Sequence, residues 1–246
     1  MNFTYKQIWL INFPVMMSLL MEQLINLTDT IFLGHVGEVE LGASALAGMY
    51  YIAIYMLGFG FSLGLQVMIA RRNGEGNLQK TGETFWQGMF FLITLSILTF
   101  TFSKVFSPVL LRTVISSDQI YLAVIQYISW RDYSFLSVFP ILAYRAFYVG
   151  ITKTRVLTIN SILLVTTNTL LNYLLIFGVG GFPRLGIAGA AIASSVAEAV
   201  ALIYLVVYTH FKVDKKKYGW RCSFNFPLLR QLFQLSSWTM IRSFFC

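Results

Sequence analysis

The chain of 246 residues is 57% hydrophobic and only 11% charged, and its mean hydropathy is +0.70. A soluble domain carries about a quarter charged residues, so this composition excludes a water-soluble globular protein and predicts an all-α, polytopic membrane protein. The net charge of +8 does not indicate nucleic-acid binding, because no basic soluble domain is present to carry it.

Six continuous apolar stretches predict six transmembrane helices, each long enough to cross about 30 Å of hydrocarbon. Strands of a membrane barrel would instead alternate polar and apolar residues over about ten positions. The expected spans are Ile8–Leu33, Leu41–Ala70, Phe85–Ser103, Trp130–Ile151, Val156–Gly178 and Ile187–Thr209.

A seventh apolar stretch begins after Phe226 and is still apolar at Cys246. From Gln231 it runs for only 16 residues and carries Arg242, which is too short to cross a bilayer. We therefore expect a fragment of a longer protein with three regions. These are a six-helix lobe over residues 1–211, a basic cytoplasmic loop over 212–227, and the start of the first helix of a missing C-terminal lobe over 228–246.

The basic residues between the spans predict the orientation in the membrane, because cytoplasmic loops carry an excess of Lys and Arg. One set of connections holds Lys6, Arg71, Arg72, Lys80, Lys153, Arg155, Lys212, Lys215, Lys216, Lys217 and Arg221, whereas the opposite set holds Arg112 and Arg184, with Lys104 at a helix end. We therefore expect a multi-pass protein of the plasma (inner) membrane with a cytoplasmic N-terminus.

The first span carries an unusual set of polar residues, with Asp29 near its outer end. A carboxylate at membrane depth costs several kcal/mol when ionised, so it normally faces a partner or a water-filled cavity. Glu22 and Asn26 lie within about 60° of Asp29 around the helix. One membrane helix thus offers two acids and an amide to a single site.

Two other spans place oxygen-bearing side chains at a similar depth in the outer half of the membrane. Asn168 and Asn172 share one helix face at i, i+4, and Ser194 lies on the sixth span. Glu198 follows Ser194 by one turn and lies near the midplane, at the same depth as Glu22.

Two carboxylates at matched depth cannot both ionise cheaply if they face one cavity, so at least one should then hold a proton. The alternative is that Glu22 and Glu198 lie on opposite sides of the bundle, each with local hydrogen bonds. Of the remaining charges, Arg131 and Asp132 are expected near the outer end of the fourth span, paired with neighbours there. Arg145 is expected to reach the cytoplasmic face.

These residues resemble the MATE (multidrug and toxic compound extrusion) family. The resemblance rests on four motifs: Pro14 followed by Asp29-Thr30-Ile31-Phe32-Leu33-Gly34; Arg145 with Gly150; Asn168-xxx-Asn172-Tyr173-Leu174-Leu175-Ile176-Phe177-Gly178; and Gly186-Ile187-Ala188-Gly189-Ala190-Ala191-Ile192-Ala193-Ser194. It implies a twelve-helix antiporter built from two six-helix lobes. Such proteins exchange H⁺ or Na⁺ for organic, often cationic, compounds by alternating access.

By this resemblance, Asp29 would be the coupling carboxylate, and Asn168, Asn172, Ala190 and Ser194 would line the same cation site. A bound Na⁺ would contact Asp29, Asn168 and Ser194, and no other cofactor is expected. Glu22, Asn26 and Glu198 are the candidate residues of a substrate or proton cavity. The implied partners are the lipid bilayer, a small organic cation and the missing C-terminal lobe.

Two positions depart from the family pattern. Asn172 stands where several members have Asp, and Glu22 and Glu198 stand where Gln is expected in many members. The extra acids favour proton coupling or a more cationic substrate.

Three alternatives remain at this point, of which a non-transporting membrane scaffold would not need the buried acids. A lipid-linked saccharide flippase of the same superfamily would favour a large basic cavity. A membrane-embedded hydrolase would need a nucleophile and a base, or metal ligands, at bilayer depth. Neither histidine lies deep in a span, so we expect that the protein is not an enzyme.

Overall fold

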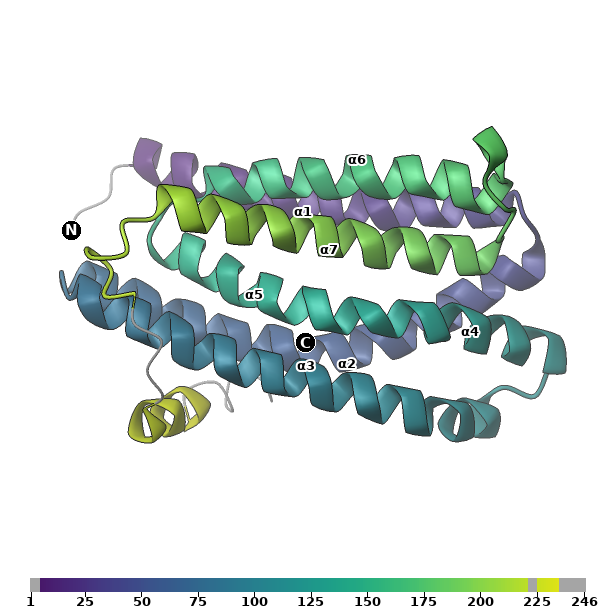
Figure 1. The fold of residues 1–246 in the computed structure, drawn as a ribbon, viewed down its shortest axis with the longest axis horizontal. Coiled ribbons are helices and arrows are strands. Elements are labelled where there is room, and N and C mark those ends of the chain that lie inside the picture. Colours follow the sequence, from purple (N-terminus) through teal and green to yellow (C-terminus); the bar gives the residue numbers. More distant parts are fainter. Residues whose placement is uncertain (1–4, 221–224, 235–246) are drawn as a thin grey trace.

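The computed structural model describes residues 5–220 and 225–234 (Figure 1). Cys222, Cys246 and most of the predicted seventh stretch lie outside the described residues. A short helix covers 226–234, so only the first part of the expected region 228–246 is described. The division into 1–211, 212–227 and 228–246 stays a prediction.

The described chain folds into α-helices without strands, which confirms the predicted all-α membrane fold. The long helices leave most of the polar backbone groups satisfied within each segment, as a membrane requires. The α-helices are α1 (Tyr5–Gly34), α2 (Glu38–Gly74), α3 (Leu78–Val114), α4 (Asp118–Arg131), α5 (Phe135–Gly150), α6 (Arg155–Phe177) and α7 (Ile187–Lys212), with 3-10 turns η1 (Asp132–Ser134) and η2 (Val179–Gly181).

The fourth predicted span is wrong in its boundaries. Helix begins at Asp118, well before the expected start at Trp130, and η1 interrupts it between Arg131 and Phe135. Arg131 lies 13 positions after Asp118, about 20 Å along the helix at 1.5 Å per residue. It is therefore deep within the bundle, where the sequence alone predicted a position near the outer end of the span.

The helices lie side by side along one long axis (Figure 1). The α1 helix packs along α6, α6 along α7, and α5 along both α2 and α3, whereas α4 lies between α2 and α7. Successive spans run in opposite directions. The α2–α3, α5–α6 and post-α7 connections, which hold most of the basic residues, therefore meet at the same end of the bundle (Figure 1).

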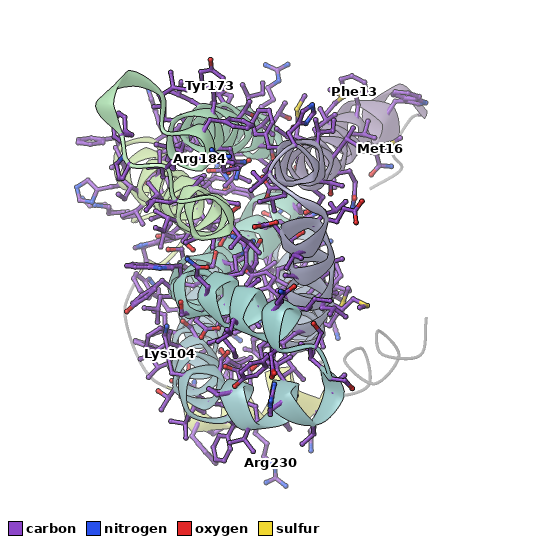
Figure 2. The ribbon with its side chains drawn as sticks, turned by 90° about the vertical axis from the view of Figure 1, so that its right-hand side faces the viewer. Phe13, Met16, Lys104, Tyr173, Arg184 and Arg230 are labelled. Carbon is purple, nitrogen blue, oxygen red and sulfur yellow. The ribbon has the colours of Figure 1, made fainter. Side chains whose placement is uncertain are left out.

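Much of the apolar surface faces outward. Among the described residues, α2, α3, α6 and α7 are each long and apolar enough to cross a membrane. In Figure 2 the side chains of Phe13 and Met16 on α1 and of Tyr173 on α6 point away from the bundle, and each is about half exposed. Outward apolar side chains on long helices are what a lipid environment accommodates.

The core between α2, α3 and α5 is built largely from aromatic rings. Its fully buried members include Phe61, Phe85, Phe135, Phe139 and Phe147. The basic segment after α7 folds back onto this core. There the ring of Trp220 stacks on that of Phe85, with centroids 4.7 Å apart. Aromatic packing of this kind fixes the end of α7 against the bundle.

A glycine brings α6 and α7 close together beside the predicted site. A Cβ built at Gly189 would lie 2.7 Å from the backbone oxygen of Leu175. Small residues at membrane helix interfaces permit such backbone approach. The same contact region carries Asn172 on α6 and Ser194 on α7.

Candidate cation and substrate site

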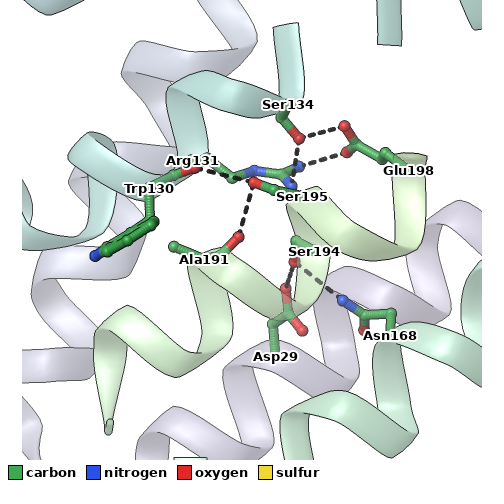
Figure 3. Close-up of polar contacts among 9 residues, drawn as sticks. All are labelled: Asp29, Trp130, Arg131, Ser134, Asn168, Ala191, Ser194, Ser195 and Glu198. Atoms are coloured by element: carbon green, nitrogen blue, oxygen red, sulfur yellow. Dashed lines mark hydrogen bonds and ion pairs between the residues drawn. The ribbon is translucent and has the colours of Figure 1, made fainter. Parts of the chain in front are cut away.

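The four polar residues expected to form the coupling site lie together across three helices. Asp29 Oδ1 on α1 accepts a hydrogen bond from Asn172 Nδ2 on α6 at 2.5 Å, and Asp29 Oδ2 accepts one from Ser194 Oγ on α7 at 3.2 Å. Asn168 Nδ2 donates to Ser194 Oγ at 3.0 Å, and Asn168 Oδ1 accepts from Asn172 Nδ2 at 3.0 Å. The network joins α1, α6 and α7 through side chains alone (Figure 3).

Two of its four hydrogen bonds end on the carboxylate of Asp29. Both Asp29 oxygens receive donors, as an ionised carboxylate requires. The Oδ1 atom of Asn172 is buried and has no hydrogen-bond partner among the described residues. A buried acceptor without a donor is uncommon, and here it lies on the same amide that contacts Asp29.

The surroundings of this network differ between its members. Asn168, Asn172 and Ser194 are buried, whereas Asp29 is only partly buried and also lines a cavity of about 330 Å³. Ala190, one turn before Ser194, is fully buried in the apolar cluster at that end of the bundle and has no place in the cavity wall. Asp29 is therefore the member through which the network meets open space.

The cavity lies between α1, α2, α4, α5, α6 and α7. Its titratable lining residues are Asp29 on α1, Tyr51 and Tyr55 on α2, Tyr127 and Arg131 on α4, Arg145 on α5, and Glu198 on α7. Asn26 also lines it, as its position on the Asp29 face of the helix predicts. Asp29 and Glu198 thus line one cavity, while the shared cavity expected for Glu22 and Glu198 stays a prediction.

Glu198 is paired with a cation. Arg131 Nη2 lies 2.9 Å from Glu198 Oε1, and Ser134 Oγ donates to Glu198 Oε2 (Figure 3). Arg131 Nη1 also donates to Ser134 Oγ at 2.9 Å, and its guanidinium lies over the ring of Tyr51 at 4.3 Å. The arginine therefore has an acidic partner, a hydroxyl partner and an aromatic face.

The residue after Arg131 faces a different helix. Asp132 is buried, accepts a hydrogen bond from Ser103 Oγ at 2.6 Å and lies 3.8 Å from Lys104 Nζ on α3. Arg131 and Asp132 are therefore not partners of each other, although they are adjacent in the sequence. At the end of α4, Arg131 contacts Glu198 on α7. The next residue, Asp132 in η1, contacts α3 instead.

Helix α7 links the Asp29 network to this break. Ser194 donates to Asp29, the neighbouring Ser195 donates to the backbone oxygen of Trp130 at 3.0 Å, and Glu198 holds Arg131. These contacts occupy little more than one turn of α7 (Figure 3). Displacement of α7 would therefore alter both sites.

The side chain of Glu22 lies outside the described part of α1, so its predicted place in the cavity stays a prediction. The sequence did not predict the pairing of Glu198 with Arg131 or the aromatic wall formed by Tyr51, Tyr55 and Tyr127. Apolar residues before Trp130 extend the fourth span back toward Asp118. A span that began there would have placed Arg131 deep enough in the membrane to meet Glu198.

Arg145 lines the cavity, whereas the sequence predicted that its side chain reaches the cytoplasmic face.

A bundle of long apolar helices around a cavity lined by charged side chains defines an integral, multi-pass membrane protein with an internal polar site. Residues 14–174 match the MatE family model, and the chain belongs to that family.

The chain is similar to proteins described as probable multidrug resistance protein NorM. With the one from Agrobacterium fabrum it shares 24% identity over 232 residues, which cover 94% of this chain and 50% of the relative. With the one from Synechocystis it shares 32% over 189 residues, 73% of this chain and 39% of the relative. The chain spans about half the length of the curated relatives that it matches.

The fold resembles that of a multidrug resistance MATE family transporter of the MOP superfamily in the outward-facing conformation. The TM-score is 0.87 at 18% identity, over 97% of this chain and 52% of the other. The likeness covers nearly all of this chain and about half of that transporter.

Proposed function

We propose that the full-length protein carrying this chain is a secondary active exporter of organic, often cationic, compounds in exchange for H⁺ or Na⁺. The observation that carries this proposal is Asp29, a membrane carboxylate that contacts Asn172 and Ser194 on one side and an open cavity on the other. Carboxylates in such positions serve ion and proton pathways in membrane proteins. The second lobe would complete the cavity, with the N-terminus in the cytoplasm and the protein in the inner membrane.

The proposed coupling site is Asp29 with Asn168, Asn172 and Ser194, and its buried acceptor is the main support for ion binding there. A proton on Asp29, after rotation of the Asn172 amide, would satisfy Asn172 Oδ1. A Na⁺ between Asp29, Asn168 and Ser194 would use carboxylate, amide and hydroxyl oxygens, which suit a hard cation. A proton would reverse the direction of the hydrogen bond between Asp29 and Asn172, whereas Na⁺ would take the place of donors on the Asp29 oxygens.

The cavity chemistry favours an organic cation over a lipid-linked saccharide. A pyrophosphate-linked lipid would need an excess of positive charge, but the described lining residues hold two guanidinium groups, Arg131 and Arg145, and two carboxylates, Asp29 and Glu198. Arg131 is already paired with Glu198, so its charge is compensated within the cavity. The tyrosine rings of the wall offer faces that attract planar cations.

The proposed site binds and releases its ligands without altering them. Among the side chains that the structure describes, which leave out Glu22, no group of three His, Cys, Asp or Glu is placed to hold a metal ion. Glu198 pairs with Arg131, and Asp29 accepts hydrogen bonds from Asn172 and Ser194, an arrangement that favours reversible cation binding over hydrolysis. We therefore keep transport as the proposal and place no catalytic residue.

The test is ethidium efflux by the full-length protein in everted membrane vesicles, driven separately by a pH gradient and by a Na⁺ gradient. Wild-type protein should export ethidium with one of the two gradients, and Asp29→Asn should abolish gradient-driven export. The matched control is Asp118→Asn, because Asp118 is 78% exposed and pairs with Arg112 on the surface. Export by Asp29→Asn at the wild-type rate would contradict the proposal.

A further inference from the structure

Glu198 and Arg131 form a closed ion pair inside the cavity, beside the Asp29 network. The side chains of Arg131 and Glu198 are only 14% and 13% exposed. The other cavity arginine, Arg145, lies 14 positions further along the chain, roughly 20 Å along the helices. Arg131 is therefore the cavity cation that contacts Glu198, one turn of α7 away from Ser194, which donates to Asp29.

The contacts of Arg131 are those that a bound organic cation would make. Its planar guanidinium lies on the face of Tyr51, pairs with Glu198 and contacts Ser134. A carboxylate combined with an aromatic face is a general receptor for planar cations. Without a cation beside it, Glu198 would be an uncompensated charge within the membrane, which is energetically costly. The guanidinium of Arg131 compensates this charge when no substrate is bound.

We propose that Glu198 is the carboxylate that binds the organic cation, and that Arg131 is its resident counter-ion, which moves to Asp29 when the substrate binds. This inference rests on the proposed export function. It adds that Glu198 and Arg131 couple the binding of the organic cation to the release of H⁺ or Na⁺ from Asp29. When H⁺ or Na⁺ occupies Asp29, Arg131 returns to Glu198 and the substrate loses its partner. In both states, the two carboxylates are balanced by Arg131 and one other cation.

The geometry fits a short movement of Arg131. Ser194, which donates to Asp29, and Glu198 are four residues apart on α7, about 6 Å along the helix axis. The hydrogen bond from Ser195 Oγ to the Trp130 backbone oxygen holds the end of α4 against this turn of α7 (Figure 3). The backbone of Arg131 thus stays in place while its long side chain changes partner.

The test is a second-site rescue, measured as ethidium binding to the purified full-length protein by fluorescence. Asp29→Asn makes this position permanently neutral, which leaves Arg131 on Glu198, and the dissociation constant should rise at least ~10-fold. Adding Arg131→Met to Asp29→Asn frees Glu198, and the dissociation constant should return to within ~3-fold of wild type. The matched control adds Arg112→Met, which removes a surface arginine paired with Asp118 and should leave the weak binding unchanged.

A second arm uses Glu198→Gln alone, in which Asp29 and Arg131 are intact but ethidium binding should be lost. Failure of Arg131→Met to restore binding, or ethidium binding to Glu198→Gln as tight as to wild type, would overturn the inference. If the Asp29→Asn/Arg131→Met protein does not fold, Arg131→Gln takes its place in the same background, and the Glu198→Gln arm decides independently. Wild-type protein that binds ethidium without exporting it would contradict the proposed function but leave the exchange at Glu198 to be decided by these variants.

Discussion

Asn172 Nδ2 lies 2.5 Å from Asp29 Oδ1, so a side chain of α6 holds a partly exposed carboxylate of α1. The contact bridges 143 positions of sequence and is the shortest bond of the Asp29 network for which α6 supplies the donor. An amide at this position gives the carboxylate a neutral donor instead of a second acid. The identity of residue 172 should therefore set which cation the site prefers.

Asn172→Asp should make the site bind Na⁺ more strongly. Two carboxylates this close need a cation or a shared proton between them. A ligand at a concentration of 100 times its Kd stabilises the folded state by about 2.7 kcal/mol, so Na⁺ should raise the Tm of the variant more than that of wild type. The measurement is thermal unfolding of the full-length protein in NaCl and in choline chloride at equal ionic strength. Asn26→Asp, which adds an acid elsewhere in the same cavity, is the control; an equal Na⁺ effect there would point to general cavity charge.

The residues of the Asp29 network could be predicted from the sequence because each stands out against an apolar helix. Asp29, Asn168, Asn172 and Ser194 are polar at membrane depth, where an unpartnered polar group is costly, so the sequence indicates that each needs a partner; their grouping in one site was implied by the family resemblance. Ala190 carries no such signal, and its predicted place in the site came from the family resemblance alone.

The partner of Glu198 could not be predicted because the fourth span was placed too late in the chain. With a start at Trp130, Arg131 lies near the membrane surface; with the observed start at Asp118, it lies deep within the bundle. The η1 break then turns Arg131 and Asp132 toward different helices, and no periodicity in the sequence marks that turn. Boundaries of elements are set by tertiary contacts that a local pattern does not contain.

Replacing one partner of the Arg131–Glu198 pair should destabilise the protein far more than replacing both. Arg131→Met leaves a buried carboxylate uncompensated and should cost about 3–5 kcal/mol. Arg131→Met combined with Glu198→Gln should recover most of that loss, because two neutral side chains need no counter-ion. The measurement is a double-mutant cycle on thermal or denaturant unfolding. Arg112→Met is the control for a surface pair, expected to cost at most about 1 kcal/mol; an additive cycle would contradict the pairing.

Gly189→Ala should separate α6 from α7 and loosen the Asp29 network. The new Cβ would lie 2.7 Å from the Leu175 backbone oxygen, which cannot move away as a side chain would. We expect a loss of about 1–3 kcal/mol in stability together with weaker ethidium export. Gly42→Ala is the matched control, since a Cβ there meets nothing within 4 Å and should be neutral or stabilise by about 0.5–1 kcal/mol. Equal Tm values for the two variants would argue against the close approach.

Ser103→Ala should destabilise the fold through Asp132. Ser103 supplies the 2.6 Å hydrogen bond to Asp132 Oδ1, while Asp132 Oδ2 has no hydrogen-bond partner among the described residues and only the 3.8 Å contact with Lys104 Nζ. Loss of the hydroxyl leaves a buried carboxylate poorly satisfied, at a cost of about 1–3 kcal/mol.

The control for this change is Ser129→Ala, whose hydroxyl donates to the Gln126 backbone oxygen within its own helix and should change stability by less than about 0.5 kcal/mol. Thermal unfolding of the full-length protein measures both variants. Adding Asp132→Asn to Ser103→Ala should recover part of the lost stability, because the group left without its donor is then uncharged. A Ser103→Ala protein that unfolds at the wild-type temperature would show that Asp132 is held by Lys104 alone, and η1 would then be tied to α3 by charge without the hydrogen bond.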